Sequence, residues 1–178
     1  MDLDVEEEYF DIGLERQRMG DLEKAIDMYD AVLEIRPAAD VYYNRGLANF
    51  ALGDVKGAIE DFTKAIELDS RKAKAYCDRA LCYNEMGEYE KAFDDFAMAT
   101  TLDPTYAIAF NNRGNFYSEH GDYSKAILDF NRAIELDPDY WAPYLNRAEC
   151  FRKLGNNQSA VQDYGKALVL QMKEDGRR

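Results

Sequence analysis

A turn glycine recurs along this chain at a nearly constant interval, and that interval restricts the fold more than any other feature. The glycines are 33, 34, 34 and 34 residues apart, at Gly20, Gly53, Gly87, Gly121 and Gly155. The same shifts align an alanine and an aromatic residue after each glycine. A period near 34 residues is typical of helical solenoids. In each copy apolar residues recur every three or four positions, which predicts an all-α chain with two amphipathic helices per copy.

The fourth copy, residues 107–140, shows the repeated pattern most clearly. Its shared slots are Phe110, Gly114, Tyr117, Gly121, Ala126, Phe130, Ala133 and Pro138. An aromatic residue, a small residue four positions later, a turn glycine, and then alanine, aromatic residue, alanine and proline resemble the tetratricopeptide repeat. The resemblance covers the chain almost end to end, although Ser70 and Met172 replace the closing proline in copies two and five. It implies a right-handed α-α superhelical solenoid of five helix-turn-helix repeats.

The repeat spacing also predicts the domain organisation. We expect a single solenoid domain over residues 6–172, with repeats at about 6–39, 40–72, 73–106, 107–140 and 141–172. Residues 1–5 are expected to be an acidic lead-in to a first helix that starts near Glu6, and residues 173–178 a polar tail. In each copy the turn glycine is expected to end the first helix, and the next residue, such as Asp21 or Asp54, to cap the second.

Charge and cysteine usage restrict the partners. The 22 basic and 35 acidic residues give a net charge of −13, which opposes attraction to nucleic acid and to anionic membranes. The surface is therefore either simply solvated or suited to a partner with a basic segment. With no signal peptide and no long apolar run, we expect no membrane span and a cytoplasmic location. Cys77, Cys82 and Cys150 lack metal-ligand spacing and are expected to be reduced, structural thiols.

The sequence offers little for catalysis. His120 is the only histidine, and it lies beside a turn glycine, where a solvated loop role is expected. No phosphate-binding glycine loop, nucleophile motif or metal-ligand motif is present. We therefore expect no enzyme activity, no cofactor and no metal.

An arginine precedes the small residue of the first helix in copies two to five. An aspartate follows each arginine after sixteen residues, which gives the pairs Arg45 and Asp61, Arg79 and Asp95, Arg113 and Asp129, and Arg147 and Asp163. The first copy has Ile12 and Met28 in these slots, so the pair is present or absent as a unit. We expect partly buried ion pairs that join the two helices of each copy, with two unrelated solvated charges as the alternative.

In tetratricopeptide proteins the first helices commonly line an inner groove that holds a peptide or a partner helix. The slot two residues before the small residue is Asn44, Asn112 and Asn146, with Asp78 and Asp11 in the other copies. Asparagine is poor in helix interiors, and its amide both donates and accepts. A ladder of such amides could hold an extended peptide backbone; plain surface polarity is the alternative.

We expect the groove side to include, from copies two to five, Asp40, Tyr43, Asn44, Leu47, Lys74, Cys77, Asp78, Leu81, Asn84, Ile108, Asn111, Asn112, Asn115, Leu145, Asn146, Glu149 and Arg152. The clamp that some family members use for chaperone tails is disfavoured. Lys74 is followed by Asp78 where the clamp needs asparagine, and no sixth copy supplies its basic pair.

These observations predict a non-catalytic protein-protein interaction scaffold. The alternatives are a self-associating structural scaffold and the recognition domain of a larger protein. Val161, Tyr164, Leu168 and Val169 occupy slots that a sixth copy would cover. Exposed apolar surfaces of this kind usually mark association sites. We therefore predict a symmetric homodimer through the C-terminal helix, with a missing extension of the chain as the rival explanation.

Overall fold

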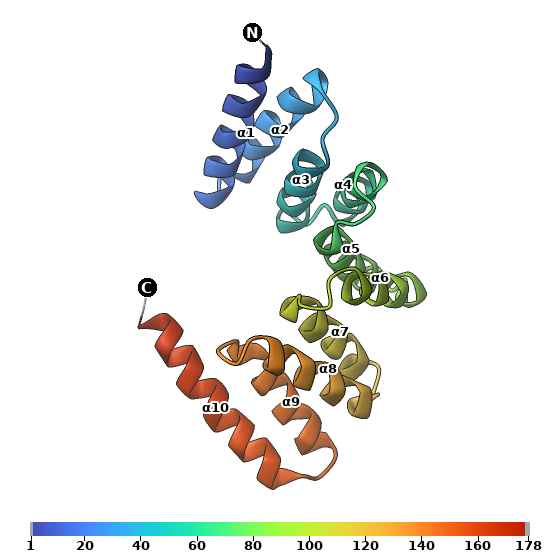
Figure 1. Ribbon diagram of the computed structural model, residues 1–178, viewed down its shortest axis with the longest axis vertical. Helices are drawn as coiled ribbons and strands as arrows, with labels where there is room; N and C mark the ends of the chain where they lie inside the picture. The colour runs from blue at the N-terminus through green and yellow to red at the C-terminus, as the bar shows by residue number, and fades with distance from the viewer. Residues whose placement is uncertain (1, 177–178) are drawn as a thin grey trace. The chain divides into compact units, whose positions relative to one another are not determined.

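The computed structural model describes residues 2–176, which form ten α-helices and no strand (Figure 1). In chain order the helices are α1 (Asp2–Arg18), α2 (Leu22–Ile35), α3 (Ala39–Ala51), α4 (Val55–Leu68), α5 (Ala73–Glu85), α6 (Tyr89–Leu102), α7 (Ala107–Glu119), α8 (Tyr123–Leu136), α9 (Trp141–Lys153) and α10 (Asn157–Asp175). Consecutive helices pack in pairs, so each predicted copy is a helix-turn-helix repeat. The helices group into two compact units, unit 1, which ends at Leu102, and unit 2, which begins at Asp103.

The turn glycines end the first helix of each repeat. All five have φ between +76° and +85°, the left-handed region that a residue with a Cβ rarely adopts. At Gly53 the backbone N–H donates to the carbonyl of Phe50, and the N–H of Asp54 donates to that of Asn49. The last carbonyls of the helix are satisfied in this way, as expected for a glycine cap.

Side chains cap most of the second helices. Asp54, Asp122 and Asn156 each accept a hydrogen bond from the backbone N–H three residues later, as predicted. The prediction is wrong for Asp21, which makes no side-chain cap bond. The Asp21 carboxylate instead accepts from Lys24 Nζ at 2.7 Å.

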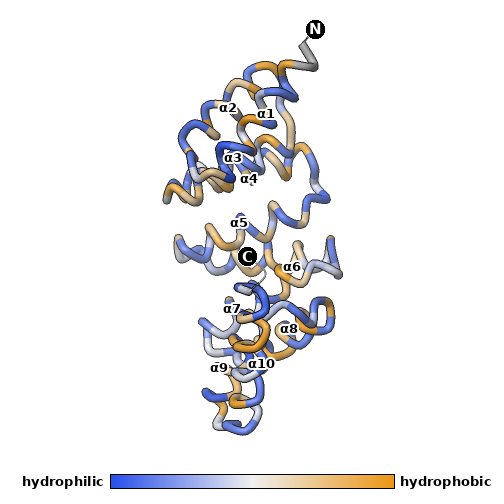
Figure 2. Tube along the Cα trace, turned by 90° about the vertical axis from the view of Figure 1, so that its left-hand side faces the viewer, coloured by the Kyte–Doolittle hydropathy of each residue, from blue (hydrophilic) through white to orange (hydrophobic). Residues whose placement is uncertain are grey.

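Small residues bring the two helices of a repeat close together. A Cβ built on Gly114 would lie 2.6 Å from Cε1 of Phe130, and one built on Gly46 would lie 2.8 Å from Cε1 of Phe62. Both rings are fully buried. Figure 2 shows hydrophobic and hydrophilic residues alternating along the helices, which is the amphipathic pattern that buries such rings on one side.

Both ends of the chain differ from the prediction. Helix α1 begins at Asp2 and not near Glu6. Helix α10 continues to Asp175, so residues 173–175 are helical and not a tail. Its extra turn is held by α9, because Trp141 Nε1 donates to Glu174 at 2.9 Å and Leu170 is buried beside Tyr144. Residues 1, 177 and 178 lie outside the described residues.

Candidate protein-interaction surface

The four predicted arginine–aspartate pairs are all present. In three pairs, those of Arg79, Arg113 and Arg147, the arginine Nε lies 2.7 Å from its aspartate, and Arg45 Nη2 lies 2.6 Å from Asp61. Each guanidinium makes at least two hydrogen bonds to its carboxylate, and each aspartate is buried. Hydrogen bonding to Asp129 raises the pKa of Arg113. The prediction of partly buried pairs between the helices of one repeat is confirmed, and the alternative of solvated charges is wrong.

Three of these arginines also reach the second helix of the preceding repeat. In unit 1, Arg79 Nη1 donates to Thr63 Oγ1 at 3.0 Å, and Arg45 Nη1 donates to Asp30. In unit 2, Arg147 Nη1 donates to Asn131 Oδ1 at 2.5 Å. Each of these arginines therefore joins three helices and aligns one repeat on the next. A polar residue in the same slot of α2, α4 and α8 was the sequence signal for these contacts, and it was missed.

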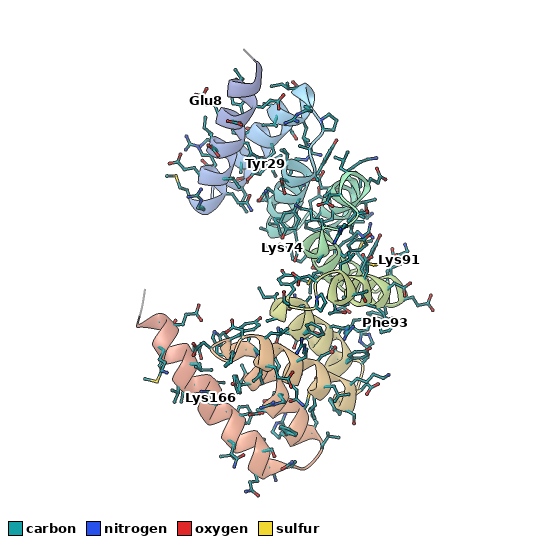
Figure 3. All side chains as sticks on the ribbon, in the orientation of Figure 1. Glu8, Tyr29, Lys74, Lys91, Phe93 and Lys166 are labelled. Carbon is teal, nitrogen blue, oxygen red and sulfur yellow. The ribbon has the colours of Figure 1, made fainter. Side chains whose placement is uncertain are left out.

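On unit 1, the predicted groove residues Asp40, Tyr43 and Asp78 form a polar network with Lys72, which directly precedes α5 and was not predicted. The Tyr43 hydroxyl donates to Asp78 Oδ2 at 2.7 Å, and Lys72 pairs with Asp40 while its Nζ lies 5.2 Å from the Tyr43 ring centroid. Burial raises the pKa of Asp78, partly offset by the bond from Tyr43. Lys74 is exposed on α5 (Figure 3). Most of this network therefore ties α3 to α5.

On unit 2, the corresponding contact joins α7 to α9. Asn146 Nδ2 donates to Asn111 Oδ1 at 3.0 Å, and Asn111 Nδ2 lies 3.3 Å from Asn112 Oδ1. Asn111 is only 4% exposed. Tyr43 and Asp78, like Asn111 and Asn146, are 35 residues apart. The slot predicted to be a ladder for a ligand thus also links consecutive first helices inside each unit.

A pocket of about 330 Å³ opens on unit 2 between α7 and α9. It is lined by Asn115, Ser118, Glu119, Asn146 and Glu149. Three of these five were predicted groove residues. The Glu149 carboxylate accepts hydrogen bonds from the Tyr164 hydroxyl and from Arg152 Nη2, which lies 2.7 Å away. These bonds lower the pKa of Glu149, so this carboxylate is held ionised at the pocket wall. The pocket presents amides, a hydroxyl and carboxylates.

The predicted groove residues vary in their exposure to solvent. Exposed on the surface are Asp40, Lys74, Ile108, Leu145 and Arg152. Half-buried are Tyr43, Asn44, Leu47, Asp78, Leu81, Asn84, Asn112, Asn115, Asn146 and Glu149. Asn44 Nδ2 donates to the backbone carbonyl of Asp40 at 2.7 Å, within its own helix. Cys77 is fully buried and, like Asn111, offers almost no surface to a partner.

The cysteines are structural thiols, as predicted. All three, at positions 77, 82 and 150, are buried and form no disulfide bond. Burial raises the pKa of Cys82 to about 12 and also raises that of Cys150. Thiols that stay protonated are poor nucleophiles.

Net charge is divided very unevenly between the units. Residues 1–102 hold 24 acidic and 12 basic residues, a net charge of −12. Residues 103–178 hold 11 acidic and 10 basic residues, a net charge of −1. Nearly all of the net negative charge therefore belongs to unit 1. Among residues 2–176, no helix is both long and apolar enough to cross a bilayer.

Known proteins resemble this chain at both the sequence and the structural level. Family models described as tetratricopeptide repeat match residues 10–73, 73–106, 107–140 and 130–162. A curated protein of Oryza sativa subsp. japonica, "Protein SGT1 homolog", is 42% identical over 57 residues, which are 32% of this chain and 16% of that protein. "Tetratricopeptide repeat protein 36" of Danio rerio is 34% identical over 64 residues, 35% of this chain and 34% of that protein. The chain thus matches about a third or less of the length of these relatives.

Solved structures match over most of the chain. A crystal structure of MamA has a TM-score of 0.78 and 27% identity, and covers 93% of this chain and 97% of that one. PilF of Pseudomonas aeruginosa has a TM-score of 0.85 and 24% identity, with 93% and 76% covered. YrrB, titled "a TPR protein with an unusual peptide-binding site", has a TM-score of 0.69 and 21% identity, with 92% and 84% covered. The predicted fold class, an all-α solenoid, is confirmed, and the chain belongs to the tetratricopeptide repeat family.

Proposed function

We propose that this protein is a non-catalytic interaction scaffold that holds an extended peptide or a partner helix on the faces of its first helices. The observation that carries the proposal is the unit 2 pocket, because residues from two consecutive first helices meet there. Membership of the tetratricopeptide family supports a protein-interaction role. The peptide-binding site named for YrrB supports the choice of a peptide, although that protein shares only the fold with this chain.

The chemistry of the pocket suits a peptide backbone. An extended peptide presents an N–H and a C=O at every residue, and the amides of Asn115 and Asn146 can each donate and accept. The carboxylates of Glu119 and Glu149 add acceptors. Because unit 1 carries a net charge of −12, we further propose that the partner carries lysine or arginine, which would accelerate its association. The asparagine ladder, the single solenoid domain and the cytoplasmic location also stay proposals.

A displayed peptide library tests this function. We expect selection on the intact chain to enrich peptides with basic residues, and a selected peptide to shift the NMR amide resonances of α7 and α9. Asn115→Arg, which fills the pocket, should abolish binding, whereas Ser124→Arg on the exposed surface of α8 should not. Shifts confined to α8 and α10, or equal binding by both variants, would refute the pocket as the peptide site.

Self-association is a second candidate function. The observation that favours it is the outer surface of α10, where Val161, Leu168, Val169 and Met172 are 51–69% exposed. Of the four apolar residues that the sequence placed on this surface, Val161, Leu168 and Val169 are exposed. The prediction is wrong for Tyr164, which is half-buried and whose hydroxyl donates to Glu149. Apolar patches of this kind usually mark association sites. We propose a homodimer through α10, which would make the protein a self-associating scaffold.

A further inference from the structure

The outer surface of α10 carries an apolar stripe with the spacing of a helix-packing seam. We call this set the α10 stripe: Val161, Gly165, Leu168 and Met172, at intervals of four, three and four residues. The three larger residues are 59–69% exposed. The buried residues of the same helix are Ala160, Asp163, Ala167 and Leu170, which pack inside unit 2. Helix α10 is therefore apolar on two opposite sides, whereas a helix at the surface of a domain needs only one.

The preceding repeat shows how the same helix positions pack when another repeat follows. In α8 the equivalent slots are Ile127, Asn131 and Ile134. Ile127 packs in the cluster that contains Cys150 of α9, and Ile134 packs in the cluster that contains Tyr144 of α9. Asn131 accepts from Arg147, also on α9. In α8 these slots are thus covered by another helix, while in α10 no described residue of unit 2 buries them.

Gly165 needs an explanation from outside its own repeat. Glycine in a helix interior is less stable than alanine, so it usually serves a close contact. At Gly46 and Gly114 that contact is the aromatic ring of the second helix. A Cβ built on Gly165 would meet nothing within 4 Å. The missing side chain at the middle of the stripe would let a second helix approach closely.

The N-terminal repeat cannot serve as that second helix. The slot of Glu8 in α1 is occupied by Val41, Ala75, Ala109 and Pro143 in the other first helices, and all four are buried. Glu8 is exposed. Stacking α1 of one copy on α10 of another would bury this carboxylate against the stripe, which is unfavourable without a cation. The Glu8 carboxylate therefore disfavours a head-to-tail contact, which would extend into a filament, and favours a contact in which both copies use the same surface.

Electrostatics also select the surface through which two copies meet. Two unit 1 surfaces would each bring a net charge of −12, whereas two unit 2 surfaces each bring −1. Like charges repel most where they are concentrated. Approach through unit 2, which contains the α10 stripe, therefore meets the least repulsion.

We propose that two copies pair through their α10 stripes, antiparallel about a two-fold axis between Gly165 and Leu168. In this arrangement Val161 of one copy packs against Met172 of the other, and Leu168 of each packs over Gly165 of the other. The arrangement is isologous, so both copies contribute the same surface. This inference rests on the self-association proposed above and adds its register and its close-approach residue.

Light scattering and cross-linking of the full chain test the proposal. Wild-type protein should show the dimer mass in a concentration series, and Leu168→Glu should show the monomer mass with an unchanged circular dichroism spectrum. Leu128→Glu is the matched control, because Leu128 is 66% exposed on α8 and outside the stripe; it should remain dimeric. Wild-type protein that stays monomeric at about 100 μM, where a dimer with a Kd of about 1 μM would be almost fully formed, overturns the dimer.

A cysteine at the proposed axis tests the register separately. Under mild oxidation Gly165→Cys should form a disulfide-linked dimer, because residues 165 of the two copies lie near the axis. Leu128→Cys should not, and the three native cysteines are buried and give no background. Gly165→Cys protein that is dimeric by light scattering but does not cross-link overturns the α10 arrangement and leaves self-association standing. Neither result bears on peptide binding at the α7–α9 pocket, which the library experiment decides.

Discussion

Replacing Gly114 by alanine has two opposite effects on the stability of the fold, a gain in helix propensity and a cost of overpacking. Alanine is more stable than glycine in a helix interior by about 1 kcal/mol. The new Cβ would lie 2.6 Å from Cε1 and 2.8 Å from Cδ1 of Phe130, a ring with no exposed surface. Overpacking of a buried site typically costs about 1–3 kcal/mol. We therefore expect Gly114→Ala to lower the free energy of unfolding by about 0–2 kcal/mol, the overpacking cost less the helix gain.

Gly165→Ala provides the matched control. It is also a glycine within a helix, and its Cβ would meet nothing within 4 Å. It should raise the free energy of unfolding by about 1 kcal/mol, so the two variants should differ by the overpacking cost alone, about 1–3 kcal/mol. Urea unfolding of dilute protein, followed by circular dichroism, measures both. If Gly114→Ala stabilises as much as Gly165→Ala, then Phe130 moves without cost and the close-packing argument fails. Ala80 and Ala148 in the same slot show that some copies do accommodate the methyl group.

Three further predictions concern the polar contacts. Arg147→Met should lower the free energy of unfolding by about 3–5 kcal/mol, because it leaves Asp163 buried without its cation. Adding Asp163→Leu should restore most of that loss, and a double-mutant cycle that shows no coupling between the two positions would refute this. Asn146→Ala should lower the free energy of unfolding by about 1–3 kcal/mol, because it removes a hydrogen-bond donor to the buried Asn111. The surface substitution Ser124→Ala should leave it unchanged, and equal unfolding midpoints for the two variants would contradict the prediction. The raised pKa of Asp78 means that the folded state holds this proton more tightly, so its contribution to stability is present at low pH and declines as pH rises from about 3.8 through the raised pKa. Asp78→Asn should remove that decline in stability. Parallel curves of unfolding free energy against pH for wild-type protein and Asp78→Asn would refute this prediction.

The sequence by itself determined the repeat, its ten helices and the four ion pairs. These follow from local rules, because a turn glycine with positive φ ends a helix, and apolar residues at three- and four-residue spacing select the buried side. The pairing of Arg147 with Asp163 could also be predicted, because a fixed offset of sixteen residues within a repeat places the two slots on facing helices. The uncovered surface of α10 was predicted by comparing its slots with those of α8.

Only the tertiary structure decided how neighbouring repeats use their polar side chains. The sequence placed Asn146 on a groove, but its bond to Asn111 depends on the distance between α7 and α9, which no single repeat specifies. The same holds for the third contact of Arg147 with Asn131. The end of α10 was also mispredicted, because a polar segment resembles a tail until the indole of Trp141 is seen to bond Glu174. Contacts within a repeat recur with the period and are visible in one sequence, whereas contacts between repeats depend on packing geometry.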